Sequence, residues 1–543
     1  MTFIPETSRR RTFAIISHPD AGKTTLTEKL LLFSGAIQIA GSVKARKATR
    51  HATSDWMEIE KQRGISVASS VMQMVYRDHV INLLDTPGHK DFSEDTYRVL
   101  TAVDCALMVI DAANGVESQT RRLIEVCRQR DTPVITFINK MDREVRDPLD
   151  ILDEVERELH MPCVPMTWPV GQGKTFGGIV NLRTRAMTVF QSGSDRLPQD
   201  FDVMPLDCPQ ALAQRFGHTW QTACDSMELA TGASPAFDPA TFLAGRQTPV
   251  FFGSGVNNFG VLEVLDALVN LAPPPGPRTS SRQVGQQRVT QQVLPEDPAF
   301  SGVVFKVQAN MDANHRDRIA FVRIASGRYT PGMRLVVMRT GKELRPTSVV
   351  TFMSQRREAV SEAYAGDIVG FTTHGGVQLG DTITDGSVKL LFTGLPFFAP
   401  EMLMTVVLKN PLRTKQLQQG LAQLGEEGAI QVFRPEVGGN MLLGAVGQLQ
   451  FEVVQHRLRG EYDADIRLEG SPYTGARWIS ADSPADLKNF VAAYPQRMAL
   501  DVANTLAFLC TSPYDVRLAQ ERFPKIQFHP LREHAGLALQ AAG

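Results

Sequence analysis

Short apolar runs alternate with stretches of helical periodicity through the first half of the chain. Four of these runs are typical of buried strands, and they lie at 13–16, 80–84, 105–110 and 133–138. Three stretches between them repeat apolar residues at helical spacing, and they span 24–33, 94–102 and 117–130. This alternation predicts βαβ units on a parallel sheet. A strand at 250–252 and a helix at 261–270 extend the α/β domain.

The pattern changes twice after this domain. A stretch at 276–298 that is rich in Pro, Gly, Ser and Gln has little to bury, and we interpret it as a linker. Residues 299–392 contain Val-, Ile- and Phe-rich runs broken by Gly and Asp, which predicts an antiparallel β-barrel. Residues 393–543 mix helical and strand patterns, which predicts an α+β domain. The first domain then spans 1–275, with an insertion of unassigned role at about 160–250.

The composition is that of a multidomain globular protein. Lys and Arg number 57 and Asp and Glu number 58, so the net charge of −1 gives no overall attraction to nucleic acid or an anionic membrane. The six cysteines are scattered without a CxxC pair, which favours free thiols in a reducing cytosol. We find no secretory signal pattern and no apolar run near the 18 or so residues of a membrane-spanning helix. We therefore expect a cytoplasmic protein.

The segment SHPDAGKTT lies between the first strand and the first helix, where a phosphate-binding loop is expected. It departs from the general GxxxxGK[ST] pattern because Ser17 stands at the first glycine position. Lys23 can reach the β- and γ-phosphates, and the Thr24 hydroxyl can ligate Mg²⁺. The phosphate-binding residues predicted here are Ser17, His18, Pro19, Asp20, Ala21, Gly22, Lys23, Thr24 and Thr25.

A second motif, Asp85-Thr86-Pro87-Gly88, follows the apolar run at 80–84 and has the DxxG pattern of GTPases. All four residues are expected near the phosphates. Asp85 can hold Mg²⁺ through a water, and the Gly88 amide can sense the γ-phosphate. His89 comes next, where other GTPases place a water-orienting Gln, and it is the candidate catalytic residue. The pattern leaves open whether His89 acts as a base or as an orienting group.

A third motif follows the run at 133–138, at the carboxyl end of a strand where α/β proteins bind ligands. The Asp142 carboxylate can accept from the N1–H and the 2-amino group of guanine, a donor pair that adenine lacks. Asn139 would tie this loop to the phosphate loop, and a backbone amide near residue 254 could reach the guanine oxygen. The predicted guanine-binding residues are Asn139, Lys140, Met141, Asp142, Ser254 and Gly255.

In this order and spacing the motifs resemble those of the translational GTPases, and within them the class II release factors. The resemblance covers nearly the whole chain. Matching stretches outside the three motifs lie at 54–65, 91–98, 305–312, 426–435 and 444–449. The resemblance implies a P-loop GTPase domain that uses GTP, yields GDP and needs Mg²⁺. It also explains Ser17, because the family keeps no first glycine there.

The same resemblance implies roles for further residues and for partners. Residues near 54–66 would form the first switch segment, and the Ser66 hydroxyl would join Thr24 and, through a water, Asp85 at Mg²⁺ in the GTP state. Relatives generally place Thr at the position of Ser66. The implied activity is ribosome-stimulated GTP hydrolysis in translation termination, which promotes dissociation of the codon-reading release factors. We expect a monomer that contacts ribosomal RNA and proteins, with no membrane partner.

The predicted barrel is unusually rich in arginine, which could contact ribosomal RNA phosphates or could lie on solvated strand faces. These arginines are Arg316, Arg318, Arg323, Arg328, Arg334, Arg339, Arg345, Arg356 and Arg357.

Three other functions stay open at this point. An elongation factor G-like translocase or ribosome-protection protein shares the first three domains, although such proteins carry further carboxyl-terminal domains. A non-hydrolysing GTP-binding scaffold is disfavoured by His89, and an ATP-dependent P-loop enzyme is disfavoured by Asp142.

Overall fold

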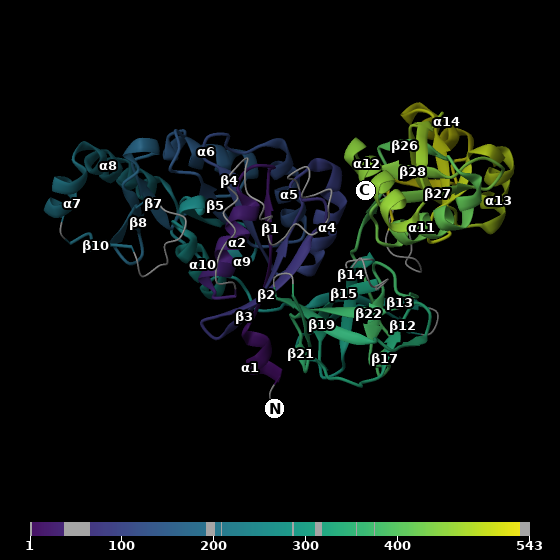
Figure 1. The fold of residues 1–543 in the computed structure, drawn as a ribbon, viewed down its shortest axis with the longest axis horizontal. Coiled ribbons are helices and arrows are strands. Elements are labelled where there is room, and N and C mark those ends of the chain that lie inside the picture. Colours follow the sequence, from purple (N-terminus) through teal and green to yellow (C-terminus); the bar gives the residue numbers. More distant parts are fainter. Residues whose placement is uncertain are drawn as a thin grey trace. The chain divides into compact units, whose positions relative to one another are not determined.

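The structure is a computed structural model, and it describes residues 3–36, 66–191, 201–207, 209–284, 287–309, 318–353, 356–373 and 375–532. The chain divides into two compact units. The first comprises Met1–His89, Ala102–Gly276 and Thr351–Glu358. The second comprises Lys90–Thr101, Pro277–Val350 and Ala359–Gly543. Figure 1 shows the elements of both.

A seven-stranded sheet forms the centre of the first unit. Its strands lie in the order β2-β3-β1-β4-β5-β11-β6, and every neighbouring pair is parallel except β2 with β3. The strands are β1 (Arg10–Ser17), β2 (Ser70–Tyr76), β3 (His79–Asp85), β4 (Cys105–Asp111), β5 (Val134–Asn139), β6 (Cys163–Pro165) and β11 (Thr248–Phe252). The main helices of this part are α1 (Phe3–Ser8), α2 (Lys23–Phe33), α5 (Ser118–Gln129), α6 (Pro148–Leu159) and α10 (Val261–Asn270). The predicted α/β domain is confirmed, with β2 as an antiparallel edge.

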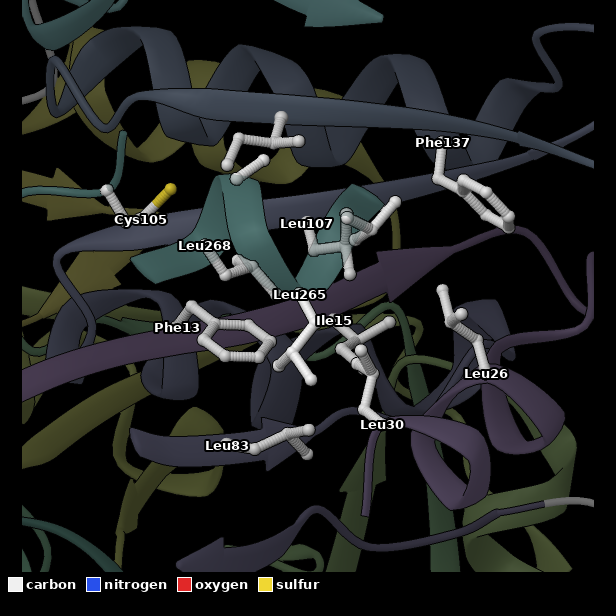
Figure 2. Close-up of a cluster of buried hydrophobic side chains, with 14 of the residues drawn as sticks. Phe13, Ile15, Leu26, Leu30, Leu83, Cys105, Leu107, Phe137, Leu265 and Leu268 are labelled. Carbon is white, nitrogen blue, oxygen red and sulfur yellow. The ribbon is translucent and has the colours of Figure 1, made fainter. Parts of the chain in front are cut away.

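One hydrophobic core joins this sheet to α2 and α10. Figure 2 shows side chains of the strands, such as Phe13 and Leu107, gathered with Leu26 of α2 and Leu265 of α10. All four are fully buried, and burial of each such side chain contributes about 1.5–3 kcal/mol. Because α2 is anchored in this way directly after β1, the loop that joins them has a fixed shape.

An additional layer interrupts the first unit between β6 and β11. Its four antiparallel strands lie in the order β10-β9-β8-β7. Its elements are β7 (Thr167–Val170), β8 (Gly178–Asn181), β9 (Ala186–Val189), β10 (Val203–Pro205), α7 (Pro209–Phe216), α8 (His218–Ala233) and α9 (Pro239–Leu243). The indole of Trp168 donates to the Ser226 hydroxyl at 3.0 Å and so ties α8 to the sheet. This layer lies within the range of 160–250 that the sequence analysis gives to an insertion, whose role stays a prediction.

A β-hairpin lies at the start of the part of the second unit that begins at Pro277. It falls inside the segment that we interpreted as a linker. Strands β12 (Arg278–Val284) and β13 (Gln287–Val293) pair with each other, and β12 also pairs with β24 (Leu391–Phe392). Val293 is buried in a small cluster with Ala325, Leu390 and Phe392. Packing against a few apolar residues that are distant in the sequence therefore stabilises this polar stretch as part of a sheet.

The predicted barrel is an antiparallel sheet in which β18, β17, β23, β14, β15, β22 and β19 are neighbours in that order. Their bounds are β14 (Ser301–Ala309), β15 (Arg318–Ser326), β17 (Leu335–Val337), β18 (Lys342–Leu344), β19 (Ser348–Met353), β22 (Ile368–Thr373) and β23 (Thr382–Thr384). A separate two-stranded pair joins β16 (Arg328–Tyr329) to β21 (Ala363–Tyr364).

The C-terminal domain has an eight-stranded sheet in the order β29-β26-β28-β27-β31-β32-β30-β33. Its strands are β26 (Met402–Leu408), β27 (Gln431–Pro435), β28 (Leu442–Ala445), β29 (Ile466–Gly470), β30 (Gly475–Ser480), β31 (Met498–Leu500), β32 (Leu506–Cys510) and β33 (Gln527–His529). Its helices are α11 (Thr414–Glu426), α12 (Gln448–Tyr462), α13 (Pro484–Ala493) and α14 (Pro513–Arg522). Strand β25 (Phe397–Phe398) pairs with β34 (Leu531–Arg532) beside this sheet. Two apolar clusters pack the helices against the sheet, as an α+β domain requires.

Within the described ranges, no helix combines the length and the apolar character needed to cross a membrane.

Candidate nucleotide-binding site

Four polar side chains end neighbouring strands at one edge of the seven-stranded sheet. Ser17 ends β1, Asp85 ends β3, Asp111 ends β4 and Asn139 ends β5. The register places Asp111 opposite Asn139. Because these strands are parallel, their carboxyl ends meet at the edge where α/β sheets bind ligands. The fold therefore brings the three predicted motifs together.

The phosphate loop turns sharply from β1 into α2. Gly22 caps the helix with φ of +95°, and a Cβ there would lie 2.3 Å from Asn139 Nδ2, so both conformation and space require glycine. The buried ammonium of Lys23 pairs with the carboxylate of Asp85. Thr24 lies half-buried in the first turn of α2. Free amides and the helix dipole favour an anion at this position.

The second motif lies against the phosphate loop. The Thr86 hydroxyl donates to the carbonyl of Ile15 at 2.7 Å, which fixes the chain as it leaves β3. A Cβ on Gly88 would lie 3.3 Å from the backbone nitrogen of Pro19, so Gly88 packs on the loop itself. His89 follows directly and is half-buried. The amide of Gly88 therefore lies beside the loop, and the imidazole belongs to the next residue.

Asn139 joins three parts of the site. Its Nδ2 donates to the carbonyl of Ala21 at 2.8 Å, and its Oδ1 accepts from the amides of Gly255 at 2.8 Å and Lys140 at 2.9 Å. The side chain is buried. One amide group thus links the phosphate loop, the third motif and the loop after β11.

Lys140 is held by a carboxylate that the sequence motifs do not include. Its Nζ donates to the carbonyl of Asp20 at 2.5 Å and to Asp111 Oδ2 at 2.7 Å. The other oxygen of Asp111 accepts from the amide of Ala113 at 2.9 Å. Asp111 ends a fully buried strand, and Asp85 likewise ends a strand that is buried from Ile81 onward. That shared position is the sequence signal that identifies it.

A second contact to the phosphate loop also lies outside the motifs. His18 Nε2 and Glu117 Oε2 are 2.7 Å apart, and both side chains are partly exposed. Glu117 stands at the N-cap of α5 but makes no capping hydrogen bond. A Glu at the start of a helix is common because it interacts favourably with the helix dipole. The position of Glu117 in the sequence therefore does not indicate a contact with His18.

Two carboxylate oxygens of the predicted motifs are buried and have no hydrogen-bond partner among the described residues. They are Asp85 Oδ2 and Asp142 Oδ1. Leaving such an atom unpaired costs about 1–3 kcal/mol or more, a cost that a bound ligand could remove. A carboxylate oxygen is the hard donor that Mg²⁺ prefers, and it also accepts from N–H groups such as those of guanine.

The loop after β11 uses its amides inside the protein. The amide of Gly253 donates to Ile138 at 3.0 Å, and that of Ser254 donates to Phe259 at 2.9 Å. The amide of Gly255 donates to Asn139, as described above. A contact from Ser254 or Gly255 to the guanine oxygen therefore stays a prediction.

Other predicted site residues have less structural context. Met141 is buried beneath the third motif, and Thr25 is half-buried in α2. Ser66 is described and half-buried, but the rest of the predicted switch at 54–65 lies outside the described residues. The role of Ser66 as a metal ligand stays a prediction.

Three family models match successive parts of the chain. Residues 8–274 match the GTP-binding domain of elongation factor Tu, and residues 299–386 match domain 2 of elongation factor G. Residues 392–520 match the C-terminal domain of class II release factor RF3. Together with the phosphate loop, the DxxG turn and the guanine motif, these matches define a translational GTPase.

Full-length relatives narrow this class. Peptide chain release factor 3 of Bordetella pertussis strain Tohama I is 64% identical over 538 residues, which cover 99% of each chain. Peptide chain release factor 3 of Nitrosomonas europaea is 62% identical over 545 residues, which cover 100% of each. The chain belongs to the peptide chain release factor 3 family. A crystal structure of a protein from Thermus thermophilus covers 87% of this chain and 69% of its own, with 23% identity and a TM-score of 0.67, which shows the fold alone.

Membership of this family confirms the function that the sequence resemblance implied. The protein is a GTPase of translation termination that recycles class I release factors from the ribosome, and it acts in the cytoplasm. GTP is its substrate. The alternatives of an elongation factor G-like protein, a non-hydrolysing scaffold and an ATP-dependent enzyme are set aside.

Several barrel arginines have partners within the second unit. Arg318 pairs with Glu426 at 2.6 Å, and Arg339 pairs with Asp381 at 2.7 Å. Arg328 and Arg345 pair with Glu362 and Glu343, and Arg323 is buried and donates to a backbone carbonyl. Arg334 is exposed. Arg316 and the side chains of Arg356 and Arg357 lie outside the described residues. These pairs favour structural roles for most of the described arginines.

Proposed function

We propose that the two unpaired carboxylate oxygens are the two ends of one GTP pocket. Asp85 Oδ2 marks the triphosphate end, and Asp142 Oδ1 marks the base end. Asn139 connects these ends through its bonds to Ala21 and Lys140. The observation that carries the proposal is that both oxygens are buried without a partner among the described residues. They lie at the sheet edge where hydrogen bonds of Asn139 and Lys140 join the neighbouring loops.

At the triphosphate end, the donor set fits Mg²⁺. Asp85 would hold the ion through a water, Thr24 would ligate it directly, and Ser66 would join in the GTP state. When bound, Mg²⁺ supplies positive charge beside the β- and γ-phosphates. Lys23, which pairs with Asp85 in this structure, has the length and charge to bind phosphate oxygens.

His89 is proposed to orient the attacking water. It follows Gly88, which packs on the phosphate loop, so the imidazole and the γ-phosphate-sensing amide are one residue apart. Hydrolysis by the free protein is expected to be slow, because the family engages this histidine on the large ribosomal subunit. The γ-phosphate would order the switch segments, and hydrolysis would release them. We also propose that the protein acts as a monomer.

The base end can be tested by replacing Asp142 with Asn. An amide presents N–H groups where guanine also presents donors, so affinity for GTP should fall about 100-fold or more. Xanthine presents an oxygen in place of the 2-amino group, so the variant should prefer xanthosine triphosphate. Competition with a fluorescent GDP analogue measures both affinities.

The exposed Asp153 of α6 gives a matched control. Asp153→Asn changes the same charge in the same unit and should leave both affinities unchanged. An Asp142→Asn protein that keeps its preference for GTP would contradict the proposed base site.

A further inference from the structure

The residues that directly follow His89 are packed into the second unit. They form a short 3₁₀ turn (Lys90–Phe92) and the start of α4 (Ser93–Ala102). Asp91, Glu94 and Arg98 are each 3–4% exposed. Burial of three charged side chains is costly unless each finds a partner, so their contacts show what holds this segment.

Asp91 caps a helix of the C-terminal domain. Helix α12 begins after Gly447, which has no side chain to offer as a cap. Asp91 Oδ2 accepts from the amide of Leu449, in the first turn of α12, at 2.9 Å. A carboxylate at this place satisfies an otherwise free amide and is favoured by the helix dipole. The cap of α12 is therefore supplied by a residue two positions after His89.

The contact requires a glycine at residue 447 because of the space that it leaves, and not because of its backbone conformation. Its φ of −155° and ψ of 169° are extended values that any residue adopts. A Cβ at this position would nevertheless lie 2.1 Å from Asp91 Cγ. Only a glycine at residue 447 lets the carboxylate reach the helix.

Arg98 makes a second contact of the same kind. Its Nη1 donates to the carbonyl of Gly428 at 3.2 Å. Gly428 has φ of +73°, and a Cβ on it would lie 2.4 Å from that nitrogen. Two glycines of the C-terminal domain thus admit two charged side chains from one short segment.

Glu94 completes the set from between these residues. One carboxylate oxygen accepts from Arg98 Nη2 at 2.9 Å, and the other accepts from Gln431 Nε2 at 3.0 Å. Burial raises the pKa of Glu94, while the charge of Arg98 acts in the opposite direction. The ring of Tyr97 packs against Phe398 at 5.2 Å between centroids. The segment is therefore held by polar and aromatic contacts along its whole length.

We propose that Asp91 is a positioning residue for GTP hydrolysis, which acts by anchoring the segment after His89 to the amino end of α12. The anchor restricts where the neighbouring imidazole can lie, so the C-terminal domain contributes to the hydrolysis rate. The inference rests on the proposed role of His89 in catalysis. Contact with the guanine base plays no part in it.

Gly447→Ala is the sharpest test, because its added methyl group fits the local backbone and the three atoms nearest to it all belong to Asp91. We expect ribosome-stimulated kcat to fall about five- to tenfold, the effect of losing one helix cap. Asp91→Ala should give a similar fall, whereas Asp91→Asn, which keeps an acceptor oxygen, should recover most of the rate. GDP affinity should stay at the wild-type value in all three.

Gly460→Ala in the same helix is the matched control, since nothing lies within 4 Å of a Cβ there. The double variant Asp91→Ala with Gly447→Ala should be no slower than Asp91→Ala alone, because both changes remove one contact. Effects that add, or a Gly447→Ala rate equal to that of Gly460→Ala, would overturn the proposal.

Thermal unfolding of each variant separates a loss of fold from a loss of rate. If a variant unfolds below the assay temperature, the double variant Asp91→Asn with Gly447→Ala takes its place in the comparison. In that double variant, the amide introduced at position 91 meets the same methyl group at position 447. Loss of GTP preference in the Asp142 variant tests the base site separately.

Discussion

At the scale of single residues, the site depends on polar side chains whose partners lie far away in the sequence. The motif residues Lys23, Asp85 and Asp142 stand out in the sequence because the role proposed for each requires its residue type and spacing. The contacts of Asp111 to Lys140 and of Glu117 to His18 could not be predicted, because only the folded sheet edge creates them. For Asn139, the motif position predicts a link between the third motif and the phosphate loop. The structure adds the three hydrogen-bond partners of its side chain.

Replacing Asn139 with Ala should weaken nucleotide binding. Three hydrogen bonds at about 1 kcal/mol each would be lost, and the amides of Gly255 and Lys140 would need new partners. We expect GDP to dissociate about 10- to 100-fold faster, as measured by release of a fluorescent analogue. Asn270→Ala, at the exposed end of α10, should leave the rate unchanged. An unchanged rate for Asn139→Ala would show that the tie has no role in binding.

At the scale of elements, helix α10 carries an acidic group in an unfavourable environment. Burial, with a smaller contribution from the nearby Asp266, raises the pKa of Glu263 from an ordinary 4.5 to about 7. A carboxyl with a raised pKa in the fold favours folding while it is protonated, below about pH 4.5. That stability is lost as the pH rises through about 7.

Glu263→Gln should therefore stabilise the first unit at high pH. We expect a gain of about 1–2 kcal/mol at pH 8, less than the full shift implies because the side chain is only partly shielded, and little change at pH 5. Urea unfolding at the two pH values measures the difference. Glu228→Gln on the exposed face of α8 is the control. An equal effect of Glu263→Gln at pH 5 and pH 8 would contradict the assignment.

The elements also show where sequence patterns are informative. The buried parallel strands could be predicted because both of their faces are apolar, so their runs are continuous. The pattern does not predict β2, whose alternation is broken by Gln73 and whose exposed Val75 dilutes the signal. The pattern also does not predict the hairpin of β12 and β13, because the hairpin is stabilised by Phe392 and other residues that are distant in the sequence. Helix α4 could be predicted, but the contact of its Arg98 with Gly428 and the contact of the preceding Asp91 with Leu449 could not.

At the scale of the whole molecule, a GTPase domain, a barrel and a C-terminal domain specific to class II release factors occur in one chain. The motifs predicted to bind and hydrolyse GTP lie within the first unit. Work on the ribosome therefore requires that the nucleotide state be communicated along the chain. The segment from His89 to Arg98 is one of the covalent connections between the two units, and it begins at the candidate catalytic residue.

The account is tested most directly by following the dissociation of a class I release factor from terminated ribosomes after peptide release. The measurement compares wild-type protein with GTP, wild-type protein with GDP, and His89→Ala with GTP. We predict fast dissociation with wild-type protein and GTP, and phosphate release at least about 100-fold slower with His89→Ala, which should bind GTP normally. Dissociation that wild-type protein with GTP does not accelerate, or phosphate release that survives the loss of His89, would contradict the account.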